Sequence, residues 1–177
     1  RYTGQDVAEM EAEGRLAARV VVMFEMSRAM ESTGLERASA MDAEYRSDWV
    51  RSGFVKMFMD GVVDSRTAYM LSDYPGTSER GDPLFAPDRF NDICAEIDRR
   101  GLQIAVHAIG DGAVRQTIDG YEAARVRNGA RDARHRIEHI ELIDRADIPR
   151  LGALGITASV QPPHPPGAMD FPMSTME

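Results

Sequence analysis

The sequence has few of the residues that cross-link or anchor a chain. Cys94 is the only cysteine among 177 residues, so an internal disulfide is excluded and we expect a cytoplasmic location. No apolar run approaches the roughly 20 residues of a membrane span, and no basic-then-apolar leader opens the chain. Basic clusters are also missing, and the net charge of −8 argues against nucleic acid and anionic membranes as partners.

Lysine is almost absent, and the position of the single lysine, Lys56, is informative. It lies within Phe-Val-Lys-Met-Phe-Met, residues 54–59, between bulky apolar neighbours. Because burying an ammonium group is costly, such a lysine is paired, neutral or chemically modified. A neutral lysine can form a Schiff base, or take up carbon dioxide to give a carbamate able to bridge two metals. In the structural alternative, Lys56 extends to the strand end or pairs with Asp60.

The chain alternates between strand-like and helix-like segments, and its composition, 43% hydrophobic and 28% charged, is typical of a globular domain. The predicted strands span residues 16–26, 54–59, 102–108, 136–140 and 156–160. The predicted helices span residues 6–13, 35–45, 87–100, 113–126 and 144–154. Alternation of this kind predicts an α/β fold with parallel strands. A complete (β/α) barrel needs eight strands and about 250 residues, more than this chain has.

Residues 61–86 are long and irregular, and loops of this length are usually functional or disordered. We expect them to form a loop over the active face. The proline-rich stretch 161–167 predicts a second loop, and residues 171–177 a disordered tail. The chain has no initiator methionine and begins at Arg1, so we expect residues 1–177 to be a single segment of a longer protein.

The run Ile104–Asp111 places His107 late in a strand and Asp111 at the following turn. Neutral imidazole is a common metal ligand and a general base tuned near neutral pH, although a core strand with His107 bonded to a carbonyl is the structural alternative. Asp111 either takes part in catalysis or only caps the next helix. The backbone N–H groups of residues 110–112 are a candidate phosphate site, although glycines are sparse there.

Residues 135–139 read His-Arg-Ile-Glu-His and have two interpretations. On a strand, His135, Ile137 and His139 share one face. On a helix, the same residues form the inverted zinc-peptidase motif, which we regard as the minority interpretation because the α/β alternation requires a strand. Nearby, His164 is held by prolines and either touches substrate or lies on the surface.

Four runs in order along the chain resemble the amidohydrolase superfamily, in its YtcJ-like branch that includes N-substituted formamide deformylase. These runs are residues 55–61 with 65–68, residues 107–111, residues 136–139, and residues 158–162 with His164. The resemblance extends from about Leu16 to about Asp170. It implies a partial (β/α)8 TIM barrel comprising strands three to seven, and a metal-dependent hydrolase of amide-like C–N bonds in small molecules.

The resemblance also implies roles for individual residues. The metal ligands, for one or two zinc ions, would be Lys56 on the fourth strand, often carboxylated in the family, with His107 and His139 on the next two strands. Catalytic roles are expected for Asp60 and Asp111. Substrate binding is expected for Arg66, Gln161 and His164.

The sequence departs from the family pattern at two points. No His-x-His pair occurs in the chain, and the aspartate of the eighth strand is missing. A zinc site without those ligands binds weakly or not at all. We therefore expect the isolated piece to be inactive and metal-free, with exposed sheet edges that favour a homodimer or swapped oligomer. The anion-binding module at residues 110–112 and the zinc peptidase at residues 135–139 remain as alternatives.

Overall fold

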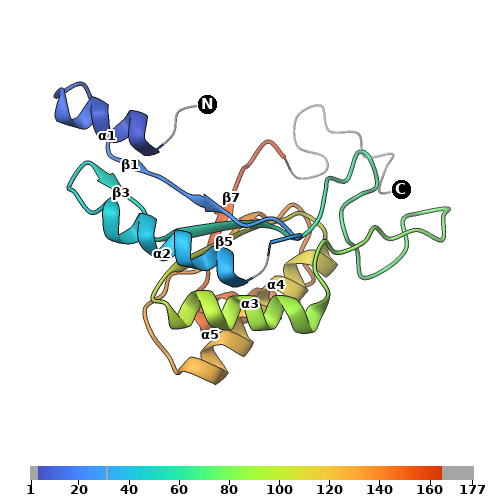
Figure 1. Ribbon diagram of the computed structural model, residues 1–177. Coiled ribbons are helices and arrows are strands. Elements are labelled where there is room, and N and C mark those ends of the chain that lie inside the picture. The colour runs from blue at the N-terminus through green and yellow to red at the C-terminus, as the bar shows by residue number, and fades with distance from the viewer. Residues whose placement is uncertain (1–3, 31, 165–177) are drawn as a thin grey trace.

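The computed structural model describes residues 4–30 and 32–164, and a five-stranded parallel sheet lies at its centre (Figure 1). Its strands, in spatial order, are β2 (Phe24–Glu25), β4 (Phe54–Phe58), β5 (Gln103–Ala108), β6 (Arg136–His139) and β7 (Thr157–Val160). Neighbouring strands follow one another along the chain without the reversal that marks a doubly wound sheet. This sequential order is that of a (β/α) barrel wall and confirms the predicted α/β class.

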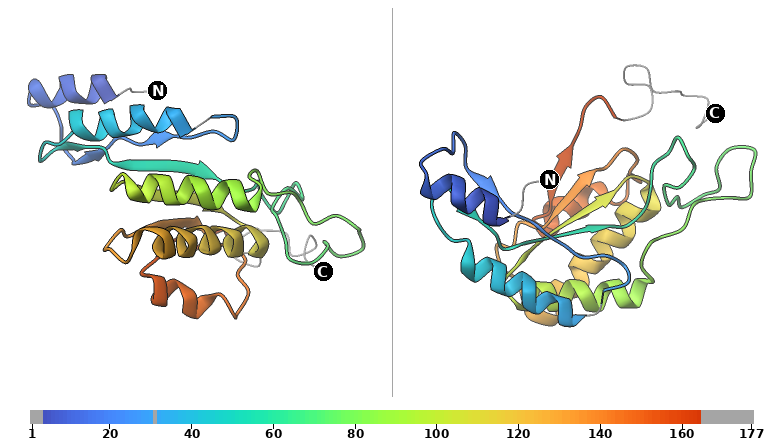
Figure 2. Two further views of the ribbon diagram at one scale, coloured as in Figure 1. Left: turned by 60° about the horizontal axis from the view of Figure 1, so that its bottom comes forward. Right: turned by 45° about the horizontal axis from the view of Figure 1, so that its top comes forward.

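The helices that follow these strands cover one face of the sheet (Figure 2). They are α2 (Leu35–Glu44), α3 (Pro87–Arg99), α4 (Asp111–Asn128) and α5 (Ile148–Leu154), while α1 (Gly4–Ala12) lies beyond the β2 edge. In a doubly wound fold the helices would be divided between both faces, whereas in a barrel they all lie outside. The face of the sheet away from α2–α5 therefore corresponds to the inside of a barrel, and we call it the inner face.

The alternation of side chains along the strands separates a hydrophobic core from this inner face. Val55, Met57, Ile104, Val106 and Ile137 are fully buried in one cluster with apolar residues of α3 and α4. The intervening positions belong to the inner face, where β4, β5 and β6 are in register. These inner-face positions are Lys56, Phe58, Ala105, His107, Arg136 and Glu138.

The predicted strand 16–26 is wrong in its extent, because this segment changes partners part way along. β1 (Val20–Val21) pairs with β3 (Val50–Arg51), a two-residue strand that the sequence did not predict, and only β2 joins the main sheet. The N–H of Val22 still bonds to Arg51, whereas that of Met26 bonds to Lys56.

The predicted helix 144–154 is also too long, because α5 begins at Ile148. Asp144 instead accepts a hydrogen bond from the Ala146 N–H at 2.8 Å, which closes a turn before the helix. The other predicted helices agree with α1–α4 to within two residues at each end, apart from a brief 3-10 turn, η1 (Ser32–Gly34), before α2. Residues 61–86 contain no helix or strand, as predicted, and the tail 171–177 lies outside the described residues. Within the described part of the chain, no helix is both long and apolar enough to span a bilayer.

Candidate metal centre

Lys56 lies on the inner face of β4, on the side of the sheet away from the helices. A position on the helix side would have excluded it as a ligand. Its amine sits 4.8 Å from the centroid of the Phe58 ring. Burial lowers the pKa of this amine below its usual range, and the attraction of Glu138 only partly opposes that effect. The lysine is therefore more easily deprotonated than a surface lysine.

His107 lies next to Phe58 on the inner face of β5, with 5.2 Å between ring centroids. Its Nε2 is 2.9 Å from the carbonyl oxygen of Gly61. Because a carbonyl can only accept, Nε2 carries the hydrogen and the neutral ring keeps the lone pair of Nδ1 free. Burial is the main cause that lowers the pKa of His107, with smaller contributions from His139 and Lys56. This histidine is therefore a neutral potential ligand.

His139 ends β6 in a backbone conformation that the sequence did not reveal. Its φ is +74° and that of Ile140 is +52°, both in the left-handed region. Strict alternation would place His139 on the helix side with Ile137. Instead its ring meets that of His107 edge-on, with 4.6 Å between the ring centroids. The prediction that His139 shares a face of the strand with His135 and Ile137 is therefore wrong. Burial again lowers the pKa of His139.

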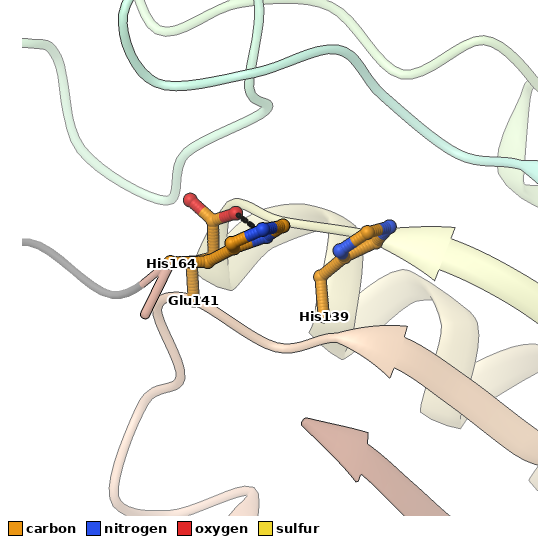
Figure 3. A group of neighbouring side chains, drawn as sticks. All are labelled: His139, Glu141 and His164. Atoms are coloured by element: carbon orange, nitrogen blue, oxygen red, sulfur yellow. Dashed lines mark ion pairs between the residues drawn. The ribbon is translucent and has the colours of Figure 1, made fainter. Parts of the chain in front are cut away.

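A cavity of about 320 Å³ opens beside the two histidines. Glu141 and His164 also line it, as does Asp64 from the long loop. Sequence reasoning did not single out Glu141, whose side chain is only 6% exposed. The sequence signal that could have identified Glu141 is its position two residues after His139, the histidine that ends the strand. Figure 3 shows that Glu141 and His164 converge beside His139 from the ends of β6 and β7.

Asp60, one of the two predicted catalytic carboxylates, is buried and bonded to backbone. Its Oδ1 accepts from the Ile109 N–H at 3.0 Å, and its Oδ2 accepts from the N–H groups of Tyr69 and Gly110, each at 2.9 Å. Burial raises the pKa of Asp60 to about 6, although the three N–H donors oppose this. Its Oδ1 is 3.6 Å from Nε2 of His107. Asp60 thus ties the long loop to the end of β5.

Asp111, the second predicted catalytic residue, performs a similar anchoring role. Its Oδ1 accepts from the N–H groups of Leu71 at 2.8 Å and Gly112 at 2.9 Å. Neither Asp111 nor Asp60 lines the cavity. Of the predicted substrate-binding residues, His164 lines the cavity, whereas Arg66 and Gln161 are exposed and do not. The Gln161 side chain nevertheless interacts with His139 and raises its pKa, against the larger effect of burial.

The anion-binding alternative at residues 110–112 is contradicted by the hydrogen bonds at the start of α4. The Gly110 N–H is taken by Asp60 and the Gly112 N–H by Asp111. The Ala113 N–H donates to the carbonyl of Tyr69 at 3.1 Å. Because two of the three N–H groups of residues 110–112 already have protein acceptors, they do not form the cradle that a phosphate requires.

The zinc-peptidase alternative is wrong as well. It needs residues 135–139 to be helical so that both histidines share a helix face, but Arg136–His139 is strand β6. His135 does not line the cavity. Its Nε2 is 3.2 Å from Asp98 Oδ1, and its Nδ1 accepts a hydrogen bond from the Ile104 N–H. The pairing of β6 with β5 and β7 fixes this geometry.

Comparisons with known proteins agree with this fold. The model of the Amidohydrolase family matches residues 3–176. Protein LONG AFTER FAR-RED 3 of Arabidopsis thaliana is 40% identical over 119 residues, which are 67% of this chain and 20% of that protein. Putative amidohydrolase YtcJ of Bacillus subtilis is 26% identical over 172 residues, 97% of this chain and 31% of that protein. N-substituted formamide deformylase of Arthrobacter pascens is 27% identical over 130 residues, 72% of this chain and 24% of that protein.

Two solved structures also resemble the chain. An uncharacterized metal-dependent hydrolase from Pyrococcus furiosus superposes with a TM-score of 0.70 at 29% identity, over 89% of this chain and 31% of that one. One from Pyrococcus horikoshii gives a TM-score of 0.69 at 25% identity, over 89% of this chain and 30% of that one. The chain thus spans 20–31% of the length of these relatives.

Proposed function

Because this chain belongs to the amidohydrolase family, we propose that it is a segment of a metal-dependent hydrolase whose metal is bound by Lys56, His107 and His139. The observation that carries the proposal is the meeting of two imidazoles at 4.6 Å at the carboxyl ends of β5 and β6. In barrel enzymes this end of the strands holds the active site. Lys56 lies close enough to lower the pKa of both histidines.

The side chains present fit a divalent metal such as zinc. Imidazole nitrogen is a preferred zinc ligand, and burial keeps both rings neutral, as a ligand must be. Nδ1 of His139 is buried and has no hydrogen-bond partner among the described residues, which is the unsatisfied state expected of a ligand atom without its ion. The bond from His107 to Gly61 would hold that ring in its binding tautomer.

Lys56 would serve as a ligand after reaction with carbon dioxide. Its neutral amine adds to the carbon of CO2, one proton leaves the nitrogen, and the product is an anionic carbamate with two oxygen donors. The lowered pKa increases the fraction of amine able to react. The inner-face position of Lys56 would allow such a carbamate to hold a metal together with the two histidines.

The proposed reaction is hydrolysis of an amide-like C–N bond in a small molecule. A bound divalent metal supplies Lewis acidity, which polarises a carbonyl and acidifies a water molecule. This chain supplies the walls of the cavity and holds the histidines in place, with Asp60 fixing the loop that carries the Gly61 carbonyl. The similarity to N-substituted formamide deformylase supports the C–N bond as target. Because the chain contains no His-x-His pair, we propose that residues 1–177 alone do not hydrolyse substrate.

The test is activity and metal content of a full-length hydrolase containing these residues. Substitutions Lys56→Met, His107→Asn and His139→Asn should each lower kcat/KM for N-substituted formamides by at least about 1000-fold and lower bound zinc. Asp132→Asn, at an exposed ion pair with Arg134, should leave both unchanged. Variants that keep full activity and zinc would overturn the assignment.

A further inference from the structure

A second group of ligand-type side chains lies at the ends of β6 and β7, next to the proposed hydrolase site. His139, Glu141 and His164 each offer one ligand atom, and the three atoms lie within 4.8 Å of one another. The rings of His139 and His164 stack at 5.6 Å with only 9° between their planes. Figure 3 shows the Glu141 carboxylate directed toward the His164 ring, where the dashed line marks their contact.

The distances are close to those that a metal requires. Ligand atoms about 2.1 Å from a tetrahedral zinc are about 3.4 Å apart. Nδ1 of His164 and Oε1 of Glu141 already have this separation, 3.4 Å. Bringing the His139 nitrogen from within 4.8 Å to the same spacing requires a closure of at most about 1.4 Å, which a side-chain rotation can supply. Two imidazoles and one carboxylate are a known catalytic ligand set for zinc, with one position left open.

Two further features indicate a cation rather than an ordinary ion pair. The side chain of Glu141 is only 6% exposed, and its Oε1 is 3.4 Å from Nδ1 of His164, which is neutral unless protonated. Nδ1 of His139 is buried without a hydrogen-bond partner among the described residues. A single cation would satisfy both atoms. An ion pair with protonated His164 would satisfy only the carboxylate.

The backbone holds these three groups in place before any ion binds. The left-handed conformations of His139 and Ile140 turn the chain so that His139 and Glu141 reach the same cavity. His164 follows two prolines, and its N–H donates to the Gln161 carbonyl at 3.0 Å, which closes a turn. The side chain of His164 is 44% exposed, so an ion can enter from the cavity side.

We infer that residues 1–177 bind one divalent transition-metal ion, zinc or a similar cation, through His139, Glu141 and His164. This site does not depend on the proposed hydrolysis. It shares His139 with the proposed hydrolase centre but needs neither Lys56 nor His107. It also needs none of the ligands that the sequence lacks, so the chain can form it alone. In a full-length hydrolase, His139 would serve one centre or the other.

Calorimetric titration of the chelator-treated 177-residue chain with zinc chloride tests the inference. We expect one zinc per chain. Glu141→Gln and His164→Asn should each weaken binding at least about 100-fold, because each removes one of three ligands. Asp64→Asn removes a carboxylate from the same cavity without removing a ligand, so affinity should change less than about threefold. Cobalt in place of zinc should give visible absorption bands that both ligand variants lose.

Lys56→Met and His107→Asn distinguish the two metal assignments. Under this inference the single-chain affinity is unchanged in both variants, and circular dichroism verifies that each remains folded. Loss of zinc in these two variants, with retention in the Glu141 and His164 variants, would overturn the inference and leave the hydrolase proposal standing. A folded wild-type chain that binds no zinc would overturn it equally.

Discussion

The buried histidine His135 should make the fold sensitive to mild acid. It lies at the opposite end of the sheet from the candidate metal centre, and its ring packs on Tyr121 at 5.0 Å. Its Nδ1 accepts the backbone N–H of Ile104 at 3.1 Å, while Nε2 faces Asp98 at 3.2 Å. Protonation of Nδ1 would replace this accepted hydrogen bond by a clash between two N–H groups.

The pKa of His135 is accordingly lowered from 6.5 to about 4, with burial as the main cause, although Asp98 opposes it. For a histidine whose folded pKa is depressed, the stabilisation is complete above the unfolded value of 6.5. It is lost as the pH falls from 6.5 toward 4. Linkage with these two values gives a loss of about 2 kcal/mol between pH 7.5 and pH 5, and about 3 kcal/mol by pH 4.

Urea unfolding of the chain between pH 7.5 and pH 4.5 measures this loss, with His135→Gln as the reference. The difference between the two proteins isolates His135, because the contribution of Asp60 is common to both and cancels. In each protein alone, Asp60 would partly mask the effect, because it contributes with the opposite sign. Its pKa of about 6 lies above the unfolded value of 3.8, so protonation stabilises the fold as the pH falls. A His135 imidazole that titrates near 6.5 by NMR, or identical pH profiles of the two proteins, would refute the reasoning.

Four other substitutions test the packing of the chain by urea unfolding. Gly110→Ala would place a methyl group 2.1 Å from the carbonyl oxygen of Tyr69 and should lower the free energy of unfolding by about 2–3 kcal/mol. Gly152→Ala has open space in α5 and should raise the free energy of unfolding by about 0.5–1 kcal/mol. Equal effects of the two substitutions would contradict the packing described. Asp60→Ala leaves three N–H groups without acceptors and should cost about 2–3 kcal/mol and speed proteolysis within residues 61–86; an unchanged cleavage rate would exclude the anchoring role. Lys56→Met removes a half-buried ammonium and should raise the urea midpoint at pH 7, and a lower midpoint would mean that the amine is satisfied by partners.

Much of the fold could be predicted from local pattern. Apolar residues recur at a spacing of two in the central strands, as at Val55 and Met57 and at Ile104 and Val106, and all four are buried. This pattern predicted the bounds of β4 and β5 to within one residue at each end. The split at residues 16–26 could not be predicted, because Val20 and Phe24 are equally strand-like and only the tertiary partners differ. A two-residue strand such as β3 carries no periodic signal.

The candidate site was predictable in its residue types but not in its detail. Lys56 and His107 follow strand alternation, so their common face was readable from sequence. The direction of the His139 side chain could not be predicted, because its left-handed backbone conformation breaks the alternation of the strand. No glycine or other residue nearby indicates a positive φ at this position. The anchoring roles of Asp60 and Asp111 depend on backbone donors up to 50 residues away, which a local pattern cannot show.

The most direct test of the proposed hydrolase centre is zinc-edge anomalous scattering from crystals of a full-length hydrolase that contains these residues. We expect an anomalous peak on the inner face, within bonding distance of His107 and His139, with the Lys56 side chain extended by a carbamate. A peak bound elsewhere, with His107 and His139 uncoordinated and Lys56 unmodified, would contradict it.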